Sequence, residues 1–285
     1  MVIHWYPGHM TKTKRMIEAN IKHVDVVCEI IDARIPKVSR NPDIDWLTAG
    51  KPRLIILNRI DLADDFATKK WIEYFKNQGF AVITTDSKSG AGVNKFSKAI
   101  NELLAEKISS WKEKGQIGKT AKAMIVGIPN VGKSSFINKV LKKRSALASD
   151  KPGVTRGKQW FKVDDGVELL DTPGILWPKL DDEHTGILLA VTGAVKDDIL
   201  DIETLACKLL EMLAVSNPQV LIDRYKIDPH MEVDFLGYEL LMDLAKKRGF
   251  LMRGAEADTL RASKILLDEY RGGVLGKLTL EMPEE

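Results

Sequence analysis

One stretch of sequence decides the fold: Gly127-Ile128-Pro129-Asn130-Val131-Gly132-Lys133-Ser134. Its spacing is that of a phosphate-binding loop, in which two glycines frame four residues and a lysine and a serine follow. The apolar run 123–126 precedes it and a run of helical character, 134–143, follows it, which is the strand–loop–helix context that the motif requires. The stretch therefore predicts an α/β nucleotide-binding domain with the phosphates at a helix N-terminus.

The side chains of this loop predict how a triphosphate is held. Lys133 is expected to reach the β- and γ-phosphates and to assist their chemistry, and the Ser134 hydroxyl is expected to bind Mg²⁺. The remaining phosphate contacts are expected from Asn130, Val131, Gly132 and Ser135.

Two downstream segments complete the phosphate site. Asp171-Thr172-Pro173-Gly174 follows an apolar run, and predicts that Asp171 holds Mg²⁺ through water while the Gly174 N–H contacts the γ-phosphate. Between this segment and the phosphate loop, Thr155 lies in a loop before a strand. Its hydroxyl is the natural second magnesium ligand; the alternative is an ordinary loop threonine.

A base-reading element lies upstream of both phosphate motifs. Asn58-Arg59-Ile60-Asp61 resembles the Asn-Lys-x-Asp guanine motif, in which the carboxylate accepts two hydrogen bonds that adenine cannot supply. Arg59 replaces the usual lysine, and its planar head can still cover the base. Ser87, in the next loop, is expected to support the base. Because this motif comes last in an ordinary small GTPase, its early position predicts a circularly permuted GTPase.

Composition and charge set broader limits. The chain has 285 residues, 44% hydrophobic and 29% charged, with a net charge of +3, which suits a globular protein of two domains. No apolar run approaches the roughly 20 residues of a membrane span, and the first residues lack the layout of a signal peptide. Two separated cysteines, Cys28 and Cys207, are interpreted as reduced and buried, so the expected location is cytoplasmic, without a membrane partner.

Hydrophobic periodicity predicts strands and helices in alternation up to the phosphate loop, and therefore a mainly parallel sheet covered on both faces. The expected helices are 11–23, 66–78, 93–114 and 134–143, and the expected strands are 24–31, 53–57, 81–84, 123–126 and 277–280. Residues 159–163 and 167–170 are expected to form a hairpin. We expect a GTPase domain over residues 1–180 and a mostly helical domain over 181–285.

The catalytic group is not the usual one. Ile175 follows Gly174, at the position where small GTPases place a glutamine that orients the attacking water. Isoleucine has no polar atom for this task. His9 is a candidate, since imidazole can hydrogen-bond a water, although residue chemistry alone favours a histidine in a turn or core.

Together these features resemble the YlqF/YawG family of circularly permuted GTPases. The resemblance covers essentially the whole chain and rests on the phosphate loop, Trp5-Tyr6-Pro7-Gly8-His9-Met10, Asp32-Ala33-Arg34-Ile35-Pro36, Ser39-Arg40-Asn41-Pro42, 171–178 and Ala190-Val191-Thr192-Gly193-Ala194. It implies a cytoplasmic GTPase that docks on the maturing large ribosomal subunit at a late assembly step. It also implies that His9 assists hydrolysis, that Asn130 binds K⁺, and that the C-terminal domain contacts ribosomal RNA.

Basic clusters and two alternatives complete the expectations. Lys246, Lys247 and Arg248 form a basic group in the C-terminal region, which also holds Arg253, Arg261, Lys264 and Arg271. These residues form an RNA-binding surface only if they share a face. The protein is expected to be a monomer. The alternatives are a mitochondrial counterpart and a GTP-dependent RNA-binding sensor with little hydrolysis, which Ile175 would suit.

Overall fold

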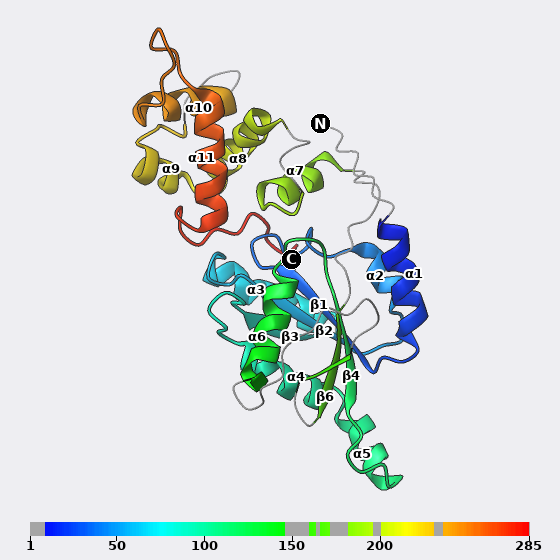
Figure 1. Ribbon diagram of the computed structural model, residues 1–285. Helices are drawn as coiled ribbons and strands as arrows, with labels where there is room; N and C mark the ends of the chain where they lie inside the picture. Colours follow the sequence, from blue (N-terminus) through cyan, green and yellow to red (C-terminus); the bar gives the residue numbers. More distant parts are fainter. Residues whose placement is uncertain are drawn as a thin grey trace.

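The computed structural model describes residues 9–145, 160–163, 166–171, 182–195, 201–230 and 236–284, with side chains left out for 9–13, 142–145 and 171. A central sheet carries helices on both faces, and a cluster of helices lies at one end of it (Figure 1). The expected α/β architecture, a sheet preceding a mostly helical C-terminal part, is confirmed within the described residues.

The sheet has the strand order β3-β2-β1-β4-β6-β5. Its strands are β1 Val26–Asp32, β2 Arg53–Asn58, β3 Ala81–Thr85, β4 Ala121–Val126, β5 Trp160–Lys162 and β6 Val167–Asp171. All neighbours pair in parallel except β5, which pairs antiparallel with β6 at the edge. The expected parallel sheet and its hairpin are therefore confirmed.

Both faces of the sheet are covered because the central strands are mostly apolar and bury side chains on both sides, as in a doubly covered parallel sheet. Every residue of β1 is buried. Its alternate side chains contact α4 (Phe96–Leu103) and α6 (Lys133–Ser145) on one face. On the opposite face they contact α1 (His9–Ile21), α2 (Pro42–Leu47) and α3 (Asp65–Asn77).

The expectation of one long helix over 93–114 is wrong. The segment forms a short 3₁₀ turn, η1 Val93–Lys95, then α4, and then α5 Ala105–Glu113 after a break at Leu104. Leu104 is 2% exposed and leaves helical geometry with φ −104° and ψ 15°. The break keeps Leu104 in the core while the more polar α5 extends away from the sheet (Figure 1). Because the apolar spacing continues across Leu104, the pattern alone predicts no interruption.

The C-terminal part is helical, with α8 (Ile202–Ser216) at its centre. Around α8 pack α7 Glu183–Val191, α9 Pro218–Tyr225, α10 Leu236–Lys247 and α11 Thr259–Gly272. Side-chain caps from Asp182, Asp201 and Asp258 begin three of these helices, as acidic N-caps commonly do.

The expected strand over 277–280 is also wrong, since no ladder forms there. The segment instead makes single backbone hydrogen bonds to the carbonyls of Leu62 and Arg34, in two loops of the sheet domain. The boundary at 180/181 lies outside the described residues, so the division into two domains stays a prediction. Within the described ranges no single helix is long and apolar enough to cross a membrane; one bent pair, Ile202–Ser216 with Pro218–Tyr225, passes by length and composition only.

Candidate nucleotide site

The motif residues meet at one edge of the sheet, because the carboxyl ends of parallel strands lie together and loops after them form the ligand crevice. Asn58, at the end of β2, is in register with Asp32 of β1 and with Thr85 of β3. On the other side of β1, β4 leads into the phosphate loop, and Ile125 is opposite Asp171 of β6. Segments distant in sequence thus converge on one site.

The phosphate loop is built so closely that two of its positions require glycine. A Cβ on Gly127 would lie 2.5 Å from the Ile30 carbonyl oxygen, and one on Gly132 would lie 2.3 Å from Asn58 Nδ2. Gly132 also has φ +92°, which disfavours a side chain. The loop ends where α6 begins at Lys133, so its backbone N–H groups and the helix N-terminus face the same space, as an anion requires.

A cavity of about 710 Å³ opens beside this loop. The described residues that line it are Arg59, Ile128, Pro129, Asn130, Gly132, Lys133, Ser134, Ser135, Thr192, Gly193 and Arg271. Six of them were expected from sequence. Ser134 is exposed to the cavity, and its hydroxyl oxygen is a suitable ligand for Mg²⁺. The N-terminus of α6 and Lys133 lie beside it and suit the nucleotide phosphates.

Asn58 lies against the phosphate loop and connects it to the end of β3 and to the loop after β3. Its Nδ2 donates to the Val131 carbonyl at 2.7 Å, and its Oδ1 accepts from Thr85 Oγ1 at 3.0 Å and from the Ser87 N–H and hydroxyl at 3.0 and 2.6 Å. Asn58 is 1% exposed and Ser87 is 3% exposed. The loop that follows β2 and holds Arg59, Ile60 and Asp61 is the base loop. The side chains of Asn58 and Ser87 shape the site by connecting the base loop to the phosphate loop. Asp61, in contrast, is exposed.

Arg59, which stands where the guanine motif usually has lysine, contacts the phosphate loop. Its Nη2 donates to the Asn130 carbonyl at 2.6 Å, and its Nη1 lies 3.6 Å from the Asp32 carboxylate. Burial lowers the pKa of Arg59, yet an arginine remains charged at neutral pH. The replacement thus keeps a cation between the base loop and the phosphate loop.

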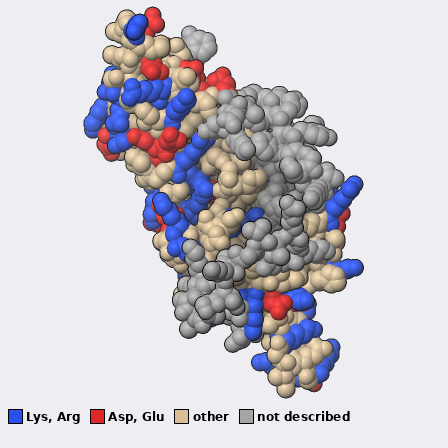
Figure 2. Space-filling view, viewed as in Figure 1, with Lys and Arg blue, Asp and Glu red and all other residues tan. Residues whose placement is uncertain are grey.

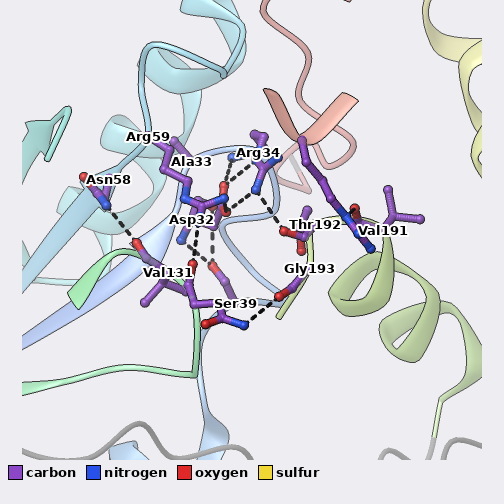
Figure 3. A network of polar contacts seen from close by, with 12 residues as sticks. Asp32, Ala33, Arg34, Ser39, Asn58, Arg59, Val131, Val191, Thr192 and Gly193 are labelled. Atoms are coloured by element: carbon purple, nitrogen blue, oxygen red, sulfur yellow. Dashed lines mark hydrogen bonds and ion pairs between the residues drawn. The ribbon is translucent and has the colours of Figure 1, made fainter. Parts of the chain in front are cut away.

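A buried ion pair lies behind Arg59 (Figure 3). Arg34 donates from Nε and Nη2 to the two carboxylate oxygens of Asp32, at 3.0 and 2.7 Å, and from Nη2 to the Thr192 carbonyl at 3.2 Å. Burial alone would favour the neutral form of Asp32, but the Arg34 guanidinium holds the pKa of that carboxyl below its ordinary value. The pair links the end of β1 to the loop after α7.

The loop after α7 is the part of the site that sequence reasoning missed. Asn130 Nδ2 donates to the Gly193 carbonyl at 2.9 Å. Arg271 of α11 donates from Nε to the Val191 carbonyl at 3.0 Å and from Nη2 to the Ala190 carbonyl at 2.8 Å. Arg271 therefore caps the C-terminal end of α7, and its grouping with the RNA-binding residues is not supported. The motif at 190–194 was the only available signal.

Two expected site residues, Thr155 and Gly174, lie outside the described part of the structure. The backbone of His9 begins α1 and that of Asp171 ends β6, but neither side chain is described. Their roles stay predictions.

Comparisons with known proteins agree with this geometry. Residues 122–222 match the family described as 50S ribosome-binding GTPases. The chain is 46% identical to ribosome biogenesis GTPase A of Bacillus cereus over 285 residues, covering 100% of this chain and 95% of that protein. It is 33% identical to the Thermotoga maritima protein of the same name over 281 residues, covering 99% and 95%.

Solved structures are similar over the same length. A GDP-bound YlqF structure superposes with a TM-score of 0.68 at 31% identity, covering 95% of this chain and 100% of that one. The GNP-bound YlqF of Thermotoga maritima superposes with a TM-score of 0.67 at 31% identity, covering 96% and 99%.

Proposed function

Because the chain belongs to the ribosome biogenesis GTPase A (YlqF) family and is a GTP hydrolase, we propose that it binds the maturing large ribosomal subunit in the cytoplasm and hydrolyses GTP at a late step of its assembly. The observation that carries this proposal is the cavity at the sheet edge. It joins the phosphate loop to Arg59 of the base loop and to Arg271 of the helical part. Nucleotide and helical part thus share one site.

Base selection is the task of Asp61. Its carboxylate accepts from the guanine N1–H and exocyclic amine, and charge-assisted hydrogen bonds of this kind contribute about 1.5–3 kcal/mol each. Its exposed position on the loop tied down by Asn58 supports this role. Asp61→Asn should weaken GTP binding and favour xanthosine triphosphate, whose 2-position is an oxygen. Unchanged GTP affinity in that variant would contradict the role of Asp61 in guanine recognition.

The phosphates and ions are assigned to the loop and its neighbours. Ser134 holds Mg²⁺ directly, with Thr155 as a second ligand and Asp171 acting through water, while Lys133 neutralises phosphate charge. Mg²⁺ supplies charge stabilisation of the transferring phosphoryl group. Asn130 donates from Nδ2 to Gly193, which leaves its side-chain oxygen as the atom for K⁺.

Water activation is assigned to His9, because Ile175 offers no polar atom. His9→Ala should lower turnover on the particle while nucleotide affinity stays nearly intact, since His9 acts on the water and not on the bound ground state. Single-turnover hydrolysis with and without subunits measures this. A His9→Ala rate equal to the parent rate would refute the role. Negligible hydrolysis by the parent even with subunits would favour the RNA-binding sensor instead.

The RNA contact is assigned to the exposed basic residues of the helical part, which Figure 2 shows interspersed with acidic side chains. The exposed members are Lys246, Lys247, Arg248, Arg253, Arg261 and Lys264. Arg248 lies 3.7 Å from Glu269, so its charge is partly compensated. RNA binding through this surface should weaken steeply with salt, by a log–log slope of about 0.7–0.9 per phosphate contact.

Co-sedimentation with large subunits tests this proposal, in GDP and in a non-hydrolysable GTP analogue. Changing Lys246, Lys247 and Arg248 together to Ala should flatten the salt slope and impair binding. The charge-matched control replaces the exposed lysines 69, 70 and 76 of α3 with Ala. Equal affinity and equal salt slope for the two triple variants would move the RNA contact elsewhere.

A further inference from the structure

The end of the chain returns to the loop that carries Asp61. Gly273 is the C-cap of α11, and a Cβ there would lie 2.5 Å from Leu62 Cδ2, so the helix end abuts the residue next to Asp61. From this point the chain runs back over the sheet domain (Figure 1). Two segments that lie far apart in the sequence thus meet at Leu62, the residue that follows Asp61.

Three contacts join this segment to the base loop. The Leu278 N–H donates to the Leu62 carbonyl at 2.9 Å. The Asp64 N–H donates to Thr279 Oγ1 at 3.0 Å, and Lys277 Nζ lies 2.9 Å from the Asp65 carboxylate. The backbone on the carboxyl side of Asp61 is therefore held by the C-terminal segment.

The same segment anchors itself on a second loop of the sheet domain. The Leu280 N–H donates to the Arg34 carbonyl at 2.9 Å. The Glu281 carboxylate accepts from the N–H groups of Lys37 and Val38 at 2.9 and 3.2 Å, and the Glu281 carbonyl accepts from Trp71 Nε1 at 2.9 Å. These bonds fix the segment independently of the base loop, so it can hold that loop in place.

The base loop needs such support. It leaves β2 through Arg59, which has φ +62°, a conformation that L side chains rarely adopt. Within the loop, the Leu62 N–H bonds the Arg59 carbonyl at 3.0 Å, and the Ile60 N–H bonds the Thr85 carbonyl at 3.3 Å. A carboxylate that reads a base edge must be held to within roughly 0.5 Å. We propose that residues 277–281 are a positioning element of the guanine site, holding the Asp61 loop so that its carboxylate meets the base.

This inference rests on the proposed reading of guanine by Asp61. Its test compares GDP with inosine diphosphate, which lacks the 2-amino group that donates to Asp61. The measured quantity is the dissociation constant of inosine diphosphate divided by that of GDP. Both constants come from competition against a fluorescent GDP. A loss of folded protein weakens both ligands equally and leaves this ratio unchanged, whereas a displaced carboxylate lowers it.

Three variants make the comparison. Thr279→Val is nearly isosteric and removes the acceptor for the Asp64 N–H. Deletion of residues 278–285 removes the contacts made by Leu278, Thr279, Leu280 and Glu281 and leaves the Lys277–Asp65 ion pair. The control deletes residues 283–285 and, among the described residues, removes the exposed ion pair of Lys37 and Glu284. Far-ultraviolet circular dichroism checks folding. Thr279→Val keeps the test decisive where the longer deletion unfolds, since it leaves the Leu278 side chain buried.

We expect Thr279→Val and the longer deletion to lower the ratio about two- to tenfold, which is part of the loss expected when a charge-assisted hydrogen bond is weakened by displacement and not removed. The control should keep the parent ratio. Equal weakening of both ligands, with the ratio unchanged, would make the segment purely structural and overturn the inference. Asp61→Asn distinguishes failure of the proposed guanine reading from failure of this inference. If Asp61→Asn leaves the ratio unchanged, Asp61 does not read guanine and both hypotheses are overturned. If Asp61→Asn lowers the ratio strongly while Thr279→Val and the 278–285 deletion do not, only the positioning role of residues 277–281 is overturned.

Discussion

Asn58→Ala should be among the most damaging single substitutions in the sheet domain. The side chain is 1% exposed and takes part in four hydrogen bonds, one donated to Val131 and three accepted from Thr85 and Ser87. A neutral hydrogen bond contributes a net 0.5–1.5 kcal/mol or so, and stranded buried partners add to the loss. We therefore expect the free energy of unfolding to fall by about 2–4 kcal/mol.

Urea unfolding without nucleotide measures this loss, and Thr85→Val is the matched control. That variant removes one of the four bonds, so it should cost about 1 kcal/mol. Only Asn58→Ala also releases the Val131 carbonyl of the phosphate loop, so it should weaken GDP binding more than Thr85→Val does. An unfolding free energy for Asn58→Ala within about 0.5 kcal/mol of the parent, the range of ordinary surface changes, would refute this reasoning.

Three further predictions concern pH, thiols and the monovalent ion. Burial raises the pKa of Glu281 to about 7 from the 4.5 of an unperturbed glutamate, so the folded state binds the extra proton and its stability falls as pH rises between these values. Glu281→Gln should remove that fall in urea titrations across the window; an unchanged pH profile would contradict it. Cys207 is half-buried and not fully buried as expected from the sequence, so a thiol reagent should modify it well before the buried Cys28, whose pKa is raised strongly by burial. Equal rates would argue against this core. GTP turnover should be faster in potassium than in sodium at equal ionic strength, and Asn130→Ala should abolish the difference. Equal rates for the parent protein in both salts would contradict a role for K⁺.

The sequence by itself determined the phosphate loop, the base loop and their rotated order. These features follow from local requirements that a pattern displays directly. Glycine stands where a Cβ would strike Ile30 or Asn58, and continuous apolar runs predict strands buried on both faces. Because parallel strands place their carboxyl ends at one edge, the convergence of the motifs on one site was also predictable. Six residues lining the cavity were identified in this way.

Only the tertiary structure decided which distant groups complete the site. In the sequence, Arg271 looks like the other basic residues of the helical part. Nothing in the residues around it indicates that its guanidinium caps α7. Asn58 matched a base-reading motif, yet its side chain ties loops together. Leu104 interrupts a helix whose periodicity continues, and residues 277–280 clamp two loops rather than join the sheet. In each case the deciding partner lies far along the chain or in the packed core, and only three-dimensional packing brings the two together.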